Sequence, residues 1–237
     1  MKRNFSFGAR KSRPQGWSGL SGERKEALDA LLQGYRVLAG ELLQDVFGIA
    51  CCLPASHVTI DVLAHFGFKA SALSVRTDIL NPAFTEALKV EGLEYCDLSQ
   101  RWLHAHPEAR VTILGSATAA EWNSGVGHTV AIAENHWLID ASLGQANAVT
   151  EDVGIHMDHV LLSTVTENFL AGRSALGLRQ PVNGCRVQYS AFINDQDFLQ
   201  SPAWHHPAIP AVTDALIEKL ENVTVVVLPD DVQQAGA

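Results

Sequence analysis

Three residue types that together can transfer or cleave an acyl group occur in this chain in the order cysteine, histidine, aspartate. Cys52 lies two residues before Pro54, at the expected start of a helix, and His128 and Asp140 lie on two later β-rich runs. In such a set a thiolate attacks a carbonyl, an imidazole takes and returns its proton, and a carboxylate orients the imidazole. The order and placement predict a Cys-His-Asp catalytic triad.

His128 and Asp140 are expected to face each other across a β-hairpin. A three-residue loop over 133–135 would pair Ile132 with His136 and place His128 directly opposite Asp140, with Cβ atoms about 5 Å apart. The asparagine that ends this loop tolerates a left-handed backbone conformation. A register shift of one residue would send the two side chains to opposite faces of the sheet.

The predicted nucleophile is one of two adjacent cysteines, Cys51 and Cys52. The positive end of a helix dipole and a nearby imidazolium both favour a thiolate at such a position. Each residue also has an ordinary structural role open to it: a buried small hydrophobe for the cysteine, a satisfied core histidine for His128 and a turn cap for Asp140. The combination of all three residues in this order favours the catalytic interpretation.

Helical spacing dominates the first part of the chain. Ser21 is the expected N-cap of a helix whose apolar residues recur at helical intervals until Gly48. A second helix is expected with Pro54 in its first turn and its end at Gly67. A strand over 70–77 and a short helix over 82–90 follow.

The second part has short β-rich runs separated by Gly, Asn and Asp, at 111–114, 129–133, 137–141, 160–165, 186–192 and 223–228. One more helix is expected over 211–220. Helices followed by an antiparallel sheet indicate an α+β fold. The expected organisation is a disordered basic tail over 1–20 and a single domain over 21–237.

Composition and charge exclude several classes of protein. The chain has 237 residues and a net charge of −9, and the first 22 residues carry five basic side chains and no acidic one. An acidic body argues against nucleic-acid binding, which needs clustered Lys and Arg. No apolar run is long enough for a membrane span. No secretion signal is recognisable, and four cysteines do not make a disulfide framework, so the expected location is cytoplasmic.

The triad and its spacing resemble the transglutaminase-like branch of the papain-type cysteine enzymes, a group that also includes the arylamine N-acetyltransferases. In these families a Gly-hydrophobic pair follows the nucleophile by fifteen residues, as Gly67-Phe68 follows Cys52 here, which favours Cys52 over Cys51. Their histidine begins a strand after a small residue, as in Gly127-His128, and their aspartate ends the next strand, as does Asp140. The resemblance covers roughly residues 50–145 and implies a papain-like fold with these three residues as the site.

The chain also departs from both families. It lacks the Arg-Gly-Gly run of the acetyltransferases and the tryptophan that commonly precedes the transglutaminase cysteine. The substrate class and the oxyanion hole are therefore left open. An oxyanion hole would need the Cys52 backbone N–H and a second donor, for which Gln44 is a candidate by analogy with papain.

The predicted function is attack on an amide, ester or thioester carbonyl through a thioacyl-enzyme, with a peptide or a small acyl or amine compound as substrate. Both acyl transfer and hydrolysis remain open. One alternative is an acyltransferase that takes its acyl group from coenzyme A or a carrier protein, and another is a catalytically inactive binding domain on the same scaffold. No metal or organic cofactor is required by this chemistry. The histidine pairs His104/His106 and His156/His159 could ligate a metal but are interpreted as structural or solvent-facing.

Overall fold

The chain begins with helices and continues into an antiparallel sheet, as expected from the sequence, with further short helices between the strands and α8 at the end of the described residues. The computed structural model describes residues 17–49, 51–93, 100–115, 127–149, 155–178 and 182–223. Its helices are η1 (Trp17–Gly19), α1 (Gly22–Phe47), α2 (Cys52–His65), α3 (Pro82–Glu91), α4 (Gln100–Ala105), α6 (Gln145–Val149), α7 (Glu167–Leu170), η4 (Asp197–Gln200) and α8 (Ile209–Val223). Its strands are β1 (Ala70–Leu80), β2 (Val111–Leu114), β3 (His128–Ala133), β4 (Trp137–Asp140), β5 (Leu161–Thr164), β6 (Leu176–Gly177) and β7 (Arg186–Ala191).

All seven strands belong to one antiparallel sheet in the order β5-β4-β3-β1-β7-β6, with β2 paired to β1. The first half of β1 pairs with β3, from Ala70 to Val75, and its last four residues pair with β2. His128 therefore starts β3 opposite Val75, close to where β2 ends opposite Thr77. This junction along β1 is where the candidate site lies.

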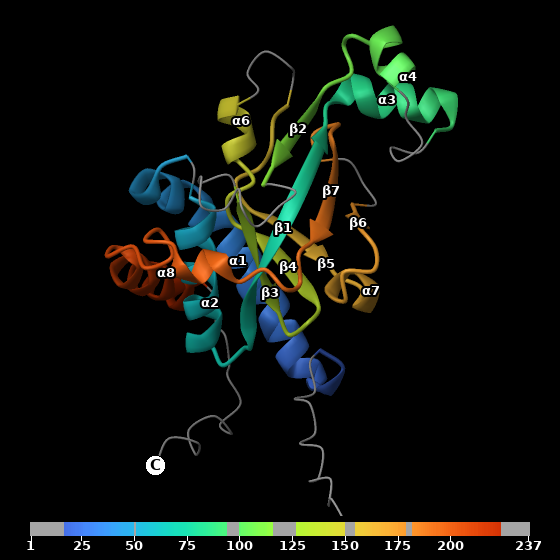
Figure 1. Cartoon of the computed structure of the whole chain (residues 1–237). Helices are drawn as coiled ribbons and strands as arrows, with labels where there is room; N and C mark the ends of the chain where they lie inside the picture. The colour runs from blue at the N-terminus through green and yellow to red at the C-terminus, as the bar shows by residue number, and fades with distance from the viewer. Residues whose placement is uncertain are drawn as a thin grey trace, which may run out of the picture.

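Two apolar cores lie on opposite faces of the sheet. One contains buried residues of α1, α2 and α8 together with Ala131, Ala133 and Ile139 of the sheet. The other contains the alternate sheet residues Val130 and Leu138, among others. Side chains alternate between the two faces along a strand, so successive residues of β3 and β4 pack into different cores. Figure 1 shows α1, α2 and α8 gathered on one side of β1 and β3, and α3 and α4 beyond the far end of β1.

Several predicted element boundaries are confirmed. The Ser21 side chain accepts a hydrogen bond from the Arg24 backbone N–H at the start of α1, and Gly48 ends that helix with φ +78°. Pro54 lies in the first turn of α2, and Gly67 follows that helix with φ +76°. The strand predicted over 70–77 continues to Leu80. The added residues pair with β2 on one side and β7 on the other, and they include the buried Asp78, whose carboxylate accepts a hydrogen bond from Arg76 at 2.8 Å.

The predicted register of the β3–β4 hairpin is wrong by two residues. Ala133 pairs with Trp137, so the three-residue turn is 134–136 and His128 is not directly opposite Asp140. Glu134 and Asn135 both adopt left-handed conformations, at φ 49° and 52°, where the sequence predicted one at Asn135. Glu134 tolerates this conformation because its backbone N–H donates to the Lys69 carbonyl and its carboxylate accepts from the Lys69 N–H, each at 2.8 Å. A shift of two residues preserves side-chain direction, so the prediction of a shared face survives.

Two further boundaries differ from expectation. Trp17, within the expected tail, donates its backbone N–H to the Glu134 carbonyl and stacks on His136 with ring centroids 4.1 Å apart. The fold therefore includes Trp17, four residues before the expected domain start at residue 21. Val223, expected to begin a strand, instead ends α8, and residues 224–228 of that strand lie outside the described part of the chain.

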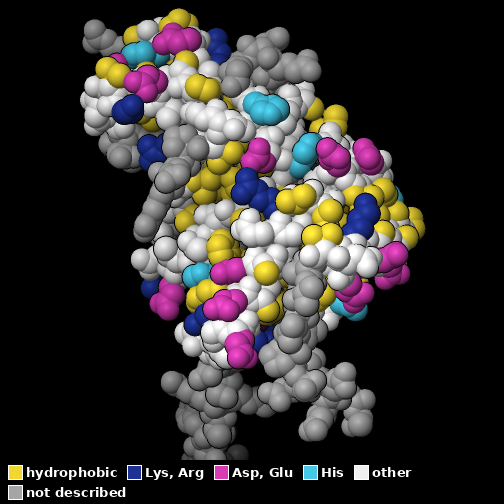
Figure 2. Space-filling model, turned by 180° about the vertical axis from the view of Figure 1, so that it is seen from behind, with side chains coloured by type: hydrophobic (Ala, Val, Ile, Leu, Met, Phe, Trp, Pro, Cys, Tyr) yellow, Lys and Arg dark blue, Asp and Glu magenta, His cyan; other side chains and the backbone are white. Residues whose placement is uncertain are grey.

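The described surface mixes charges of both signs. On the face drawn in Figure 2, Lys and Arg side chains lie scattered, most of them beside acidic ones, without forming a continuous basic stripe. Among the residues that the structure describes, no helix combines the length and the apolar character needed to cross a bilayer.

Candidate functional site

Cys52 is the first residue of α2, at the end of that helix that carries a partial positive charge. Its thiol donates a hydrogen bond to the Gly127 carbonyl, with the sulfur and oxygen 3.5 Å apart. Thr129 of β3 fixes this helix end, because its hydroxyl donates to the Cys52 carbonyl at 3.0 Å. The Ser56 hydroxyl, one turn further along α2, donates to the Thr129 carbonyl at 3.1 Å. These contacts hold the thiol beside the first residue of β3.

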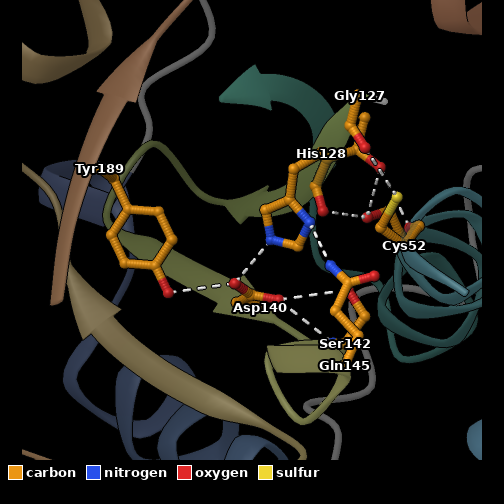
Figure 3. A network of polar contacts seen from close by, with 9 residues as sticks. Cys52, Gly127, His128, Asp140, Ser142, Gln145 and Tyr189 are labelled. Carbon is orange, nitrogen blue, oxygen red and sulfur yellow. Dashed lines mark hydrogen bonds and ion pairs between the residues drawn. The ribbon is translucent and has the colours of Figure 1, made fainter. Parts of the chain in front are cut away.

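That first residue is His128, and it forms a buried pair with Asp140. The distance from His128 Nε2 to Asp140 Oδ2 is 2.8 Å, and both side chains are fully buried. Figure 3 shows the imidazole between Asp140 on one side and Cys52 and Gln145 on the other. The structure thus brings together all three residues predicted from the sequence.

Asp140 accepts further hydrogen bonds that stabilise a carboxylate and hold it in place. The Tyr189 hydroxyl of β7 donates to Oδ2 at 3.1 Å, and Ser142 donates to Oδ1 from its backbone N–H at 3.1 Å and from its hydroxyl at 3.4 Å. Buried carboxylates need such donors because water cannot solvate them. Burial next to this carboxylate raises the pKa of Tyr189 well above its usual value, so the phenol stays protonated as a donor.

The environment of His128 favours its charged form. Burial alone would lower the pKa of this imidazole, but attraction to Asp140, their hydrogen bond and the nearby Cys52 thiol outweigh it and raise the pKa to about 10. An imidazole with a raised proton affinity is suited to accept the proton of a thiol. The pair can therefore act as a general base with a fixed orientation.

The other ring nitrogen of His128 faces a glutamine. Gln145 is the first residue of α6, and its side-chain amide forms a hydrogen bond with His128 Nδ1 at 2.8 Å. This contact with the imidazole is a different role from the oxyanion-hole donor suggested for Gln44 of α1, which stays a prediction.

The two adjacent cysteines have different surroundings. Cys51 precedes α2 as its N-cap and belongs to the apolar core formed with α1 and α8. Burial, then the proximity of Cys52 and Asp140, raises the pKa of the Cys51 thiol to about 12, which keeps it protonated and poorly nucleophilic. Cys52 instead begins α2, with its thiol against the Gly127 carbonyl and beside the His128 ring.

Three residues of the site were not predicted from the sequence: Ser142, Gln145 and Tyr189. Ser142 and Gln145 lie within the segment interpreted as hairpin and turn, two and five residues after Asp140. The short helix that begins at Gln145 had no recognisable cap signal. Tyr189 is 49 residues from Asp140, and only the pairing of β7 with β1 brings it close.

Gly115 is required where β2 ends beside β3. It has φ +83°, and a Cβ placed there would lie 2.5 Å from the Val75 carbonyl oxygen and 3.0 Å from His128 Cβ. Replacing Gly115 by Ala is expected to lower the free energy of unfolding by about 1–3 kcal/mol, the cost of a strained backbone residue. Urea unfolding monitored by circular dichroism measures this loss. Gly177→Ala is the control, since no atom lies within 4 Å of the added methyl group there; equal effects of the two changes would contradict the account.

The described residues offer no clear metal centre. Within the described ranges, no group of three or more His, Cys, Asp or Glu residues gathers as metal ligands would. His106 pairs with Glu91 at 2.9 Å and stacks on Trp102. The arrangement at Cys52, His128 and Asp140 is thus the strongest candidate site on chemical grounds.

Comparisons with known proteins do not assign a family to this site. No family model, curated protein or solved structure matches the chain significantly.

Proposed function

We propose that this protein is an enzyme of the transglutaminase-like and papain-like type, in which Cys52 attacks an amide, ester or thioester carbonyl. The observation that carries the proposal is the buried His128–Asp140 pair, with its 2.8 Å contact, beside a cysteine at the start of a helix. A nucleophile, a base and a group that orients the base are the parts that covalent acyl chemistry requires.

In the proposed reaction, the Cys52 thiol gives its proton to His128 Nδ1 and keeps the electron pair on sulfur. The thiolate forms a bond to the carbonyl carbon, and the tetrahedral intermediate collapses by breaking the bond to the leaving group. The imidazolium returns its proton to that leaving group, which departs as an amine, alcohol or thiol. Water or an amine then attacks the thioester by the same steps and releases Cys52.

Asp140 orients His128 in this scheme. Its acceptance of the Nε2–H leaves Nδ1 as the basic nitrogen, and its charge stabilises the imidazolium that forms. The donors from Tyr189 and Ser142 hold the carboxylate, so the base does not depend on solvent for its orientation.

The buried pair also favours an enzyme over an inactive binding domain. Burying two ionisable groups incurs a desolvation penalty that often exceeds their mutual attraction, so such pairs are poor devices for stability alone. Strongly perturbed titratable groups beside a nucleophile are characteristic of active sites. Peptides and small acyl or amine compounds are the substrates that this chemistry suits.

Acylation by an activated ester tests the proposal. Incubation with p-nitrophenyl acetate is expected to release p-nitrophenolate in a burst and to leave an acetyl thioester on Cys52, detected by peptide mass spectrometry. Cys52→Ala should abolish both signals, because the carbonyl then has no nucleophile. Cys51→Ala is the matched control and should retain them. Acetylation that is confined to Cys51, or that persists equally in both variants, would contradict the proposal.

A further inference from the structure

One oxygen of Asp140 accepts hydrogen bonds from both His128 and Tyr189. His128 Nε2 lies 2.8 Å from Oδ2 and the Tyr189 hydroxyl lies 3.1 Å from the same atom, whereas Ser142 donates to Oδ1. Figure 3 shows the contacts from Tyr189 and His128 meeting at the same carboxylate oxygen. The phenol and the imidazole therefore share the negative charge of one atom.

Tyr189 takes part in this contact as a neutral donor. Its side chain is fully buried, and burial, followed by the proximity of Asp140, raises its pKa well above the usual value. The other titratable groups that face the buried pair are the thiols at the start of α2. Cys52 lies beside the imidazole, and Cys51 lies close enough to Asp140 for the carboxylate to raise its pKa. Tyr189 is thus the neutral group bonded directly to the oxygen that holds the ring.

We propose that Tyr189 is a positioning residue that limits how strongly Asp140 stabilises the His128 imidazolium, so that this imidazolium can return a proton to the leaving group. The inference rests on the proposed function. In the step concerned, the bond between the carbonyl carbon and the leaving group breaks, and its electron pair stays on the leaving group. That atom takes the proton from the imidazolium as the N–H bond breaks, and the thioester remains on Cys52.

A donor to Oδ2 makes the imidazolium a stronger acid in two ways. It spreads the negative charge of the carboxylate, which weakens the attraction to the ring, and it places a partly positive hydrogen near the imidazolium. Burial lowers the pKa of His128, but Asp140 and Cys52 raise it to about 10 even with this donor present. Without the donor the imidazolium would be a still weaker acid, further from the pKa that suits proton transfer near neutrality.

Tyr189→Phe separates the hydroxyl from the ring, because phenylalanine keeps the aromatic side chain that packs in the core below the sheet. The test compares the rates at which Cys52 is acetylated by phenyl acetate and by p-nitrophenyl acetate near neutral pH. Phenolate is the stronger base and needs the proton, whereas p-nitrophenolate departs without it. The ratio of the phenyl acetate rate to the p-nitrophenyl acetate rate is expected to fall by roughly twofold to fivefold in the variant. Both esters react with the same thiol, so a general loss of active protein cancels.

A second measurement follows the ring itself. The titration midpoint of His128, read from the nuclear magnetic resonance signal of its Cε1 in labelled protein, is expected to rise in Tyr189→Phe by about 0.5–1 pH unit. This is part of the shift that one hydrogen bond to a charged group can produce. A residue that only supports the fold would leave this midpoint unchanged.

Thr77→Val provides the matched control. Thr77 lies directly opposite Tyr189 in the pairing of β1 with β7, so both side chains are on the same face of the sheet. Its hydroxyl is buried and has no hydrogen-bond partner in the described structure. Removing this hydroxyl should change neither the ratio of the ester rates nor the midpoint of His128.

Two results overturn different parts of the account. If wild-type Cys52 is acetylated but Tyr189→Phe leaves both the ester ratio and the midpoint unchanged, or changes them no more than Thr77→Val does, the inference fails alone. If neither ester acetylates Cys52 in the wild type, the proposed function fails and the inference with it.

Discussion

Replacing Asp140 by Ala is expected to lower the free energy of unfolding by about 3–5 kcal/mol, the range seen when one partner of a buried ion pair is removed. The change removes the only carboxylate in contact with the His128 ring among the described residues and leaves the Tyr189 hydroxyl and the Ser142 N–H without their acceptor. Each of these groups is buried, so water cannot replace the lost contact. Denaturant titration measures the loss.

Asp158→Ala is the matched control, because it also breaks an ion pair, with Arg36 at 2.9 Å. Both of those side chains are nearly half exposed, and such pairs contribute about 0–1 kcal/mol. A loss at Asp140 no larger than the loss at Asp158 would show that the buried pair is not formed in solution.

Asp140→Ala should also remove a pH dependence of the free energy of unfolding. Because the folded protein raises the pKa of His128 from about 6.5 to about 10, the ion pair contributes its full stability below about pH 6.5. That contribution declines as the pH rises towards 10, where the folded ring also loses its proton. The stability difference between wild type and Asp140→Ala should therefore be largest near pH 6 and shrink at alkaline pH. A stability difference between the two proteins that grows as the pH rises would contradict a raised pKa of His128 in the folded state.

The parts of the fold set by local sequence were largely predictable. Ser21, Gly48 and Pro54 act within one turn of the backbone they cap or begin, so their types identify the helix ends. The shared face of His128 and Asp140 follows from alternation along a strand. Their register does not, since the turn is displaced by contacts of Glu134 with Lys69 and of His136 with Trp17, which are remote in sequence.

The site was predictable only for the residues that have a chemical signature. Cys52, His128 and Asp140 stand out by type, order and spacing. Tyr189 is one of three tyrosines and Gln145 is a glutamine in a turn-like segment, and neither has a local pattern that marks a role. Their contacts arise from the pairing of β7 with β1 and from the direction of the chain after Asp140. These contacts depend on the tertiary structure, so no local sequence pattern indicates them.

Replacing His128 by Ala is expected to remove the reactivity of Cys52 at acidic pH. Near pH 6 an unassisted thiol is almost wholly protonated, so rapid alkylation there requires a neighbour that takes the proton. His128 is the titratable group placed for this, because its ring lies beside the thiol and its proton affinity is raised by Asp140. The loss in rate should be at least about tenfold near pH 6. It should fade towards alkaline pH, where the thiolate forms without help.

The most direct test of the account is therefore the second-order rate of iodoacetamide alkylation at Cys52, measured by peptide mass spectrometry across the pH range for wild type and His128→Ala. Cys185, which is free and buried and whose pKa is raised by burial, serves as an internal reference within each sample. The account predicts rapid alkylation of wild-type Cys52 on the acid side of neutrality and an ordinary thiol profile in the variant. Identical profiles in the two proteins would contradict the claim that His128 activates Cys52.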